Sequence, residues 1–233
     1  DDNLGKLLNF LRSTGLKDDT LVIFASDHGE MHGSHGRINK MVPYQEAINV
    51  PLIFNWPEKI PEGVKCKEIY TPMDHLPTLC DLLDIPIPEK IDGKSISNRI
   101  LNGSTKKERE AALIMNYTSH WNRFLSQTPQ EAKRYSLRCW PEWRGVYTGD
   151  YTYAQWLSGK EELYQNIEDP YQLNDLTNKS KQKLEQLRNQ LQELLADADD
   201  KFASGDHYSS WYDKNRRLIK TSSGPVRADL GVE

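Results

Sequence analysis

The chain has 233 residues, of which 37% are hydrophobic and 27% charged, and its formal net charge is −4 at pH 7. A chain of this length typically buries about 70% of the surface that its unfolded form exposes, which is enough for a substantial core. The small acidic charge, without a long basic stripe, argues against nucleic acid as a partner. The apolar runs fall short of the roughly 18 residues of a membrane helix, and the first residues do not resemble a secretory signal. We therefore expect no membrane partner.

The first hundred residues predict a helix, two strands and a second helix. Leucines recur at helical spacing over residues 4–11, and Gly15 is suited to end that helix in a left-handed conformation. The runs at 20–26 and 50–56 are short, apolar and rich in β-branched residues, as in a parallel sheet that is covered on both faces. Residues 71–85 predict a helix that packs beside these strands through four leucines: Leu76, Leu79, Leu82 and Leu83.

The character of the sequence changes near residue 104. Residues 111–118 and 144–156 predict strands, and the second stretch predicts a hairpin that turns at Gly149 and Asp150. Leucines over 184–195 mark a long amphipathic helix that we expect to cover this smaller antiparallel sheet. We therefore expect three parts: an α/β domain over 1–103, a small α+β subdomain over 104–204 and an irregular tail over 205–233.

The loop at residues 26–40, "SDHGEMHGSHGRINK", is rich in groups that bind ligands. Asp27 and His28 follow a predicted strand, and ligands collect beyond the carboxyl ends of strands in α/β sheets. An adjacent carboxylate and imidazole suit a divalent cation, although two ligands do not complete a site. Lys40 offers a positive charge to an anion held beside that metal. The alternative is an ordinary turn in which Asp27 accepts local amide hydrogen bonds and Lys40 is solvated.

For the other histidines and for the cysteines, the residues by themselves suggest structural roles. For His32 and His35 we expect hydrogen bonds to the loop backbone, and for His75 we expect packing or capping in a helix. Three cysteines cannot all pair, and none has the two-residue spacing of a metal knuckle. Idle thiols are therefore expected at Cys66, Cys80 and Cys139.

Residues 18–57, "DDTLVIFASDHGEMHGSHGRINKMVPYQEAINVPLIFNWP", resemble the second half of a type I sulfatase of the alkaline phosphatase superfamily. Downstream, "MDHLPTLCDLLDI", "IDGKSI", "WRGVYTGDYTYAQW" and "ELYQNIEDPYQLNDL" are similar to the small C-terminal subdomain of that family. The resemblance implies the α/β fold class: part of an alkaline-phosphatase-like, mostly parallel sheet with helices, then a small antiparallel sheet with a long C-terminal helix. It covers residues 1–195.

This resemblance implies a sulfuric ester hydrolase that binds one calcium ion and acts on a sulfated sugar. It implies that Asp27 and His28 are metal ligands, that Lys40 is a catalytic residue contacting the sulfate group, and that His35 is a further substrate contact. The formylglycine nucleophile of the family belongs to the amino-terminal half, so we expect this chain to be a fragment that is inactive alone. Family members are often exported, which favours a periplasmic or secreted protein.

Two alternatives stay open. A phosphonate or phosphate ester hydrolase of the same superfamily would use similar residues, and the imidazole of His28 suits softer metals than calcium. A non-catalytic module would instead bind glycans through aromatic and basic residues such as Trp121, Arg123, Trp140 and Trp143.

Two further expectations concern the fragment itself. The segment "CWPEWR" has its arginine one residue too far from the cysteine to match the nucleophile motif of the family, so we expect its likeness to be coincidental. An apolar sheet edge without its neighbouring strands predicts self-association.

Overall fold

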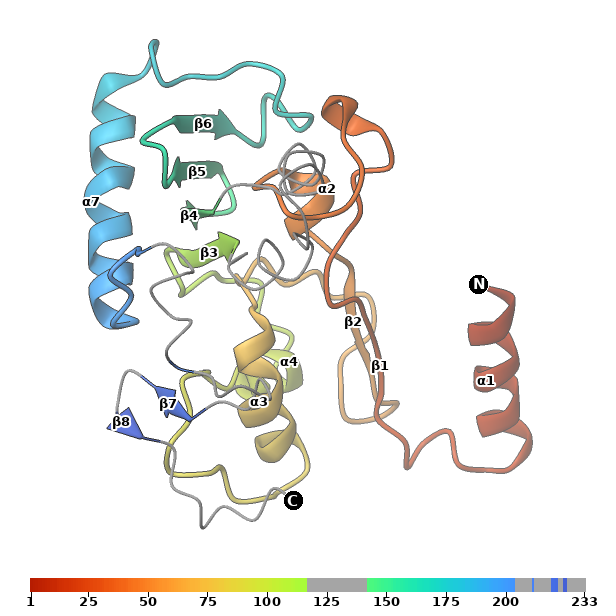
Figure 1. Cartoon of the computed structure of the whole chain (residues 1–233). Helices are drawn as coiled ribbons and strands as arrows, with labels where there is room; N and C mark the ends of the chain where they lie inside the picture. The colour runs from red at the N-terminus through yellow and green to blue at the C-terminus, as the bar shows by residue number, and fades with distance from the viewer. Residues whose placement is uncertain (117–141, 204–210, 212–218, 222–223, 226–233) are drawn as a thin grey trace, which may run out of the picture. The chain divides into compact units, whose positions relative to one another are not determined.

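The computed structural model describes residues 1–116, 142–203, 211, 219–221 and 224–225 (Figure 1). It divides into two compact units, and each unit combines two separate stretches of the sequence. The first unit contains residues 1–40 and 46–110, and the second contains residues 41–45 and 111–233. Within the described ranges, no helix is both long enough and apolar enough to span a membrane.

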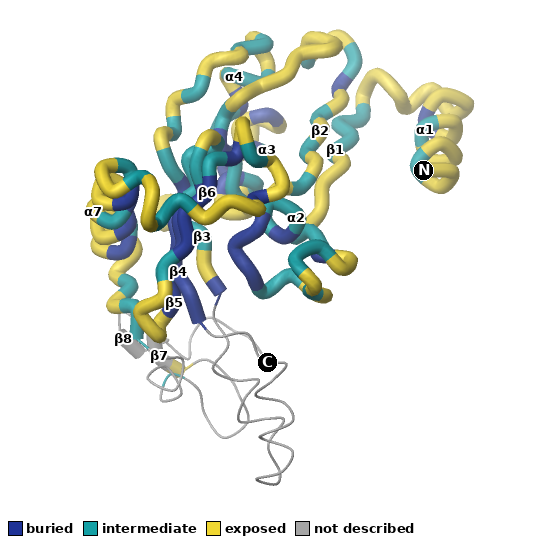
Figure 2. Tube along the Cα trace, turned by 90° about the horizontal axis from the view of Figure 1, so that it is seen from above, coloured by how far each residue is buried: buried dark blue, intermediate teal, exposed yellow. Residues whose placement is uncertain are grey.

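The first unit begins with the expected helix, α1, over Asp2–Ser13. The helix ends as predicted, because Gly15 has a φ of 72° and the amide of Leu16 donates to the carbonyl of Leu11 at 3.0 Å. These features form a Schellman-type C-terminus. Leu11 is the buried residue of α1, and the rest of the helix is exposed or half-buried (Figure 2).

Both strands expected in the first unit are present, as β1 (Val22–Ala25) and β2 (Leu52–Asn55). They pair with each other in antiparallel orientation, with Val22 opposite Asn55 and Ala25 opposite Leu52. The sequence suggested strands of a mostly parallel sheet, whereas this pair is antiparallel. Within this chain the strand pair leaves apolar side chains uncovered, because Phe24 is 43% exposed and Ile53 is 55% exposed.

Two short helices lie between β1 and β2 in the sequence, η1 (Ser34–Gly36) and α2 (Gln45–Ile48). Three more follow β2: η2 (Pro72–Asp74), α3 (His75–Leu82) and α4 (Ser97–Leu101). The helix predicted over 71–85 corresponds to η2 and α3. Its buried face differs from the prediction, because Leu76 and Leu83 are exposed and Leu79 is half-buried. The buried positions of α3 are instead Pro77, Thr78, Cys80 and Leu82.

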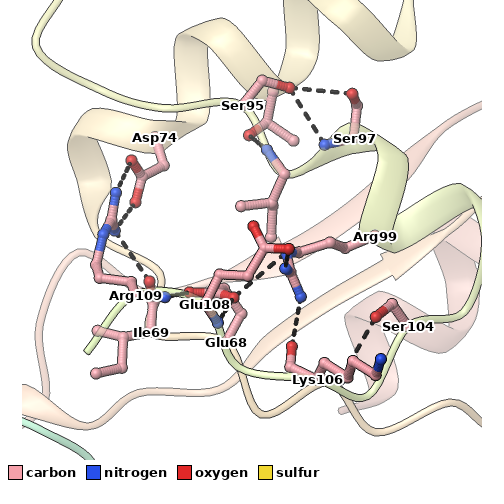
Figure 3. Close-up of polar contacts among 12 residues, drawn as sticks. Glu68, Ile69, Asp74, Ser95, Ser97, Arg99, Ser104, Lys106, Glu108 and Arg109 are labelled. Atoms are coloured by element: carbon pink, nitrogen blue, oxygen red, sulfur yellow. Dashed lines mark hydrogen bonds and ion pairs between the residues drawn. The ribbon is translucent and has the colours of Figure 1, made fainter. Parts of the chain in front are cut away.

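A buried ion pair joins the start of these helices to the end of the first unit (Figure 3). The carboxylate of Asp74 has no exposed surface and accepts two hydrogen bonds from the guanidinium of Arg109, at 2.5 and 2.8 Å. It also accepts from the amides of Thr71 and Lys94, at 2.7 and 2.9 Å. The carboxylate therefore ties together three stretches of chain that are far apart in the sequence.

The second unit contains a four-stranded antiparallel sheet in the order β3-β4-β5-β6. The predicted strands are present as β3 (Ala112–Asn116), β4 (Trp143–Tyr147) and β5 (Tyr151–Trp156), with the predicted turn at Gly149 and Asp150. The sequence did not predict β6 (Glu161–Gln165). Two-residue strands β7 (Lys220–Thr221) and β8 (Gly224–Pro225) pair in the tail, and most of the residues after Gly205 lie outside the described ranges.

The long amphipathic helix is α7, over Lys181–Asp197, and it covers one face of this sheet as predicted (Figure 1). Its leucines form a buried cluster with one inward-facing side chain from each of three strands. The dark, buried side of α7 in Figure 2 is the leucine stripe, and its other side is exposed. The cluster contains Leu184, Leu187, Leu191, Leu195, Val146, Tyr153 and Leu163.

Residues 41–45 pack on the second unit although they follow the first forty residues in the sequence. The indole of Trp143 donates to the carbonyl of Met41 at 3.0 Å, and the amide of Gln45 donates to the side chain of Gln172 at 2.8 Å. The ring of Tyr44 lies edge-on to that of Tyr164. Because side chains alternate along a strand, Trp143 and Tyr164 lie on the sheet face opposite the α7 cluster. This segment therefore covers that second face.

Candidate functional site

The candidate site begins where β1 ends at Ala25 and the chain turns through Ser26, Asp27 and His28. The hydroxyl of Ser26 donates to the carbonyl of His28 at 2.7 Å, and the amide of His28 donates to one carboxylate oxygen of Asp27 at 3.1 Å. These local bonds are those of the ordinary turn that the sequence left open as the alternative to a metal site. They leave the Asp27 carboxylate 83% exposed, so its oxygens remain accessible to a ligand.

The imidazole of His28 is oriented by its own neighbour. Its Nδ1 lies 2.7 Å from the carbonyl oxygen of Gly29. Because a carbonyl oxygen only accepts, Nδ1 carries a hydrogen, and in the neutral ring Nε2 then has a lone pair. Nε2 lies 3.2 Å from Oδ2 of Asp27. A backbone carbonyl that orients one ring nitrogen while the other faces a ligand is the usual arrangement of metal-binding histidines.

Gly29 lets the turn approach α2 closely. Its amide donates to the carbonyl of Ala47 at 2.9 Å. A Cβ atom at position 29 would lie 1.8 Å from the carbonyl oxygen of Glu46, a distance that no side chain tolerates. Glycine is therefore required here by close backbone contact.

The rest of the loop closes on itself before Lys40. The amide of Met31 donates to the carbonyl of Asn39 at 2.9 Å, and the amide of Asn39 donates to the carboxylate of Glu30. His35 is half-buried in η1 with a left-handed φ of 54°. Lys40 is also half-buried, and no hydrogen bond or ion pair to any described residue engages its ammonium group.

The structure therefore brings Asp27 and His28 into contact and holds the backbone beside Lys40. Its described contacts do not include one between Lys40 and the Asp27–His28 pair. In the part of the chain that the structure describes, no group of three or more histidine, cysteine or acidic side chains is arranged to hold a metal. Among the described residues, Asp27 and His28 are the pair of candidate ligands that lie together at the end of β1. Glu30 and its bond to Asn39 were not identified from the sequence.

Some of the other candidate residues lie in the described part of the chain and others do not. Trp143 is 2% exposed and its indole is bonded within the protein, so its ring is not available to stack on a sugar. Cys66 and Cys80 are free thiols, exposed and buried respectively. The remaining proposed glycan contacts and the "CWPEWR" cysteine lie outside the described residues: Trp121, Arg123, Trp140 and Cys139.

Comparison with solved structures defines the class of protein to which this fold belongs. The structure matches that of a protein in complex with its substrate D-glucosamine-2-N,6-O-disulfate, with a TM-score of 0.72 and 26% identity over 86% of this chain and 39% of that one. It also matches the phosphonate monoester hydrolase of Agrobacterium radiobacter, with a TM-score of 0.66 and 24% identity over 96% of this chain and 42% of that one. The second likeness establishes a shared fold alone. The fold is that of alkaline-phosphatase-like sulfatases, which confirms the expected fold class.

Sequence comparison then identifies the family. The family model for N-sulphoglucosamine sulphohydrolase, C-terminal, matches residues 33–201, so the chain belongs to this sulfatase family. An ulvan-active sulfatase of Formosa agariphila is 34% identical over 249 aligned residues, which include 100% of this chain and 45% of that protein. The chain thus spans less than half the length of this relative and corresponds to the C-terminal part of sulfatases. Sulfatases generally use a metal ion and a formylglycine.

Proposed function

We propose that the protein to which this chain belongs is a sulfatase that hydrolyses sulfate esters of carbohydrates. One observation of the structure carries the proposal: the His28 imidazole is held by the Gly29 carbonyl so that its free nitrogen faces the Asp27 carboxylate at the end of β1. Membership of the sulfatase family supports the reaction. A sulfated glucosamine is the substrate in one related structure, and this supports a sulfated sugar as the substrate class.

Asp27 and His28 are, in this proposal, two ligands of one divalent cation. The two side chains fit this role because a neutral imidazole nitrogen and a carboxylate oxygen 3.2 Å apart repel one another unless a proton or cation lies between them. The exposed carboxylate suits calcium, the ion implied by the family resemblance, and its further ligands come from elsewhere in the protein. When bound, such a cation polarises the sulfate oxygens.

Lys40 is the proposed catalytic residue of this chain. Its ammonium group has three donors and no described partner, which suits it to a sulfate oxygen and to the oxygen that leaves with the sugar. Positive charge at that place stabilises the negative charge that develops in the transition state. We propose that His35 lines the same pocket. The formylglycine nucleophile is proposed to lie in the part of the protein outside this chain.

The experiment uses the full-length protein with sulfated glucosamines and a matched phosphonate monoester. Lys40→Ala is expected to lower kcat/KM for the sulfate ester by about 10²- to 10³-fold, the usual cost of removing one donor to a developing oxyanion. Asp27→Ala is expected to lower it and also to weaken calcium binding in isothermal titration calorimetry. Gln192→Ala, on the exposed side of α7, is the control and leaves both quantities unchanged.

Different results would favour the two alternatives. Faster turnover of the phosphonate than of the sulfate ester, with zinc or manganese preferred to calcium, would identify a phosphonate hydrolase. Glycan binding without hydrolysis, unaffected by Lys40→Ala, would identify a binding module. Export from the cytoplasm and self-association through the β1–β2 edge stay predictions that fractionation and analytical ultracentrifugation can test.

A further inference from the structure

Both neighbours of Lys40 in the sequence have backbone groups that are held by hydrogen bonds, with a side chain and a backbone amide at Asn39 and with a side chain at Met41. On one side, the amide of Asn39 donates to the carboxylate of Glu30, and the carbonyl of Asn39 accepts from the amide of Met31 at 2.9 Å. On the other side, the carbonyl of Met41 accepts from the indole of Trp143 at 3.0 Å. The backbone is therefore held immediately before and immediately after the lysine.

The first anchor adds to the loop's own backbone hydrogen bonds, which include those around η1 and the one from Met31 to Asn39. Between Glu30 and Lys40 the backbone has positive φ at five residues, three of which are not glycine. Such conformations persist only where surrounding contacts determine them. A hydrogen bond to a carboxylate is stronger than one between neutral groups, so Glu30 is suited to this task. The five residues are His32, Gly33, His35, Gly36 and Asn39.

The second anchor lies inside the second unit. Trp143 is 2% exposed, and Val42, next to the anchored Met41, is 1% exposed. A buried indole N–H cannot bond to water, so a hydrogen bond to a protein acceptor is favourable. The Met41 carbonyl is that acceptor, and it is one peptide away from Lys40. A strand of the small sheet thus holds the carbonyl of Met41, the residue that follows the lysine.

We propose that Glu30 and Trp143 are positioning residues for Lys40. The inference rests on the proposed function and assigns to these residues the placement of the lysine's ammonium group on the sulfate. A lysine side chain is long and flexible, so the position of its charge depends on where its backbone is held. A displacement of about 1 Å at a reacting group can cost about 10²-fold in rate, so loosening either anchor has a measurable effect.

A double-mutant cycle in the full-length protein tests this inference. Glu30→Ala, Glu30→Gln and Trp143→Phe are each made with Lys40 present and in a Lys40→Ala background. We measure kcat and KM with a series of aryl sulfates, and the affinity for inorganic sulfate by calorimetry. With Lys40 present, Glu30→Ala is expected to lower kcat/KM by about 10- to 100-fold. Glu30→Gln recovers most of this loss, because its amide oxygen still accepts from Asn39.

The Lys40→Ala background separates positioning from general damage. There, Glu30→Ala and Trp143→Phe are expected to cause little further loss of turnover or of sulfate binding. Trp56→Phe is the matched control, because it removes an indole bond to the Asp18 carbonyl at 3.1 Å, away from Lys40 in the sequence. Its effect is expected to be equal in both backgrounds. Thermal unfolding of each variant confirms that the compared proteins are folded.

Two results would count against different claims. Equal losses in both backgrounds, in turnover and in sulfate binding alike, would show that Glu30 and Trp143 are only structural and would overturn the inference while leaving the sulfatase proposal intact. A folded wild-type protein that binds sulfate with the expected coupling but hydrolyses no sulfate ester would overturn the proposed function and keep the inference.

Discussion

Asp74 is a carboxylate with no exposed surface, and the cost of burying its charge is met by several donors. Arg109 contributes two of them (Figure 3), and the others are the amides of Thr71 and Lys94 and the hydroxyl of Thr71. Removing one partner of a buried pair leaves the other charge uncompensated. The contribution of Asp74 to stability is therefore measured by removing its side chain.

We expect Asp74→Ala to lower the free energy of unfolding by about 3–5 kcal/mol, because it leaves the Arg109 guanidinium without its partner. Chemical denaturation measures the change. Glu185→Ala is the comparison, because the two side chains of the Arg188–Glu185 pair are 42% and 62% exposed and such pairs contribute about 0–1 kcal/mol. Similar losses for the two variants would contradict the assignment of a special role to burial.

Ionisable side chains also predict how stability depends on pH. Burial opposes ionisation of Asp74, but the hydrogen bonds of Arg109, Lys94 and Thr71 outweigh it, so the pKa of Asp74 is lowered from its ordinary 3.8. A lowered pKa in the folded state stabilises the protein above the ordinary value, and this contribution is lost as the pH falls below it. Burial raises the pKa of Tyr70 to about 12, so its contribution is complete below pH 10 and is lost as the pH rises through 12.

Stability is therefore expected to fall below about pH 4 and again above about pH 10, at the ordinary pKa values of these two groups. Denaturation midpoints measured across this range test the expectation. Asp74→Asn should flatten the acid side of the curve, and Tyr70→Phe should flatten the alkaline side. An unchanged curve in both variants would assign the pH dependence to other groups.

Helix α7 packs on the sheet mainly through its leucine stripe, and Arg188 adds an ion pair with Glu161 of β6. Leu191 has no exposed surface and lies in the middle of the cluster that contains Val146, Tyr153 and Leu163. A cavity at this position would be surrounded by side chains from both the helix and the sheet. The helix therefore depends on tertiary packing more than on its own propensity.

We expect Leu191→Ala to cost about 2–5 kcal/mol, since it removes buried methyl groups and leaves a cavity. Gln192→Ala, one position further on the exposed side, is expected to change stability by less than about 0.5 kcal/mol. Thermal or chemical unfolding followed by circular dichroism compares the two. A small effect at Leu191 would mean that the cluster collapses around the missing side chain.

Helices and strands with a strong hydrophobic periodicity were predictable from the sequence, but the elements and residues that they contact were not. The spacing of the leucines predicts α7 and its sheet-facing side, and the Gly149–Asp150 turn predicts the β4–β5 hairpin. Strand β6 contains two glutamates, and this weakens its apolar pattern. In α3, Thr78 is buried because its hydroxyl accepts from the amide of Ile96, a contact with no local signal. Pairing direction in β1–β2 likewise depends on contacts that periodicity does not encode.

The candidate site was predictable to the same extent. Asp27, His28 and Lys40 are distinguished by residue type and by their place after a strand, and their roles as ligands and catalyst stay predictions. Glu30 carries no pattern in the sequence that indicates its bond to Asn39. From the sequence, Trp143 could equally be an exposed aromatic residue or a core residue. Its buried hydrogen bond to the Met41 carbonyl shows that it is a core residue.

On the scale of the whole molecule, each unit is built from two separate stretches of the sequence. A residue can therefore belong to a different unit from its neighbours in the sequence. Tyr44 precedes β2 in the sequence but belongs to the second unit, where it is 5% exposed and contacts Tyr164. Damage at Tyr44 should therefore spread through the small sheet. It should not follow the neighbouring sequence into the first unit.

We expect Tyr44→Ala to increase hydrogen exchange in β5 and β6 by at least about tenfold, corresponding to a local loss of about 1.4 kcal/mol. Exchange in α3 should not change. Ile38→Ala is the control, since this nearby side chain is 68% exposed. Exchange measured by mass spectrometry distinguishes the units, and faster exchange in α3 than in β5 would contradict the division.

The five residues after Lys40 also constrain how these proteins can be recombined. A graft that takes the small sheet and α7 from one sulfatase and joins them to another at residue 110 leaves behind the peptide at 41–45, which packs on the grafted sheet. The new sheet then meets a foreign peptide on the face opposite its helix. Functional hybrids will therefore require two crossover points, and substitutions at 41–45 should covary with those in β4, β5 and β6.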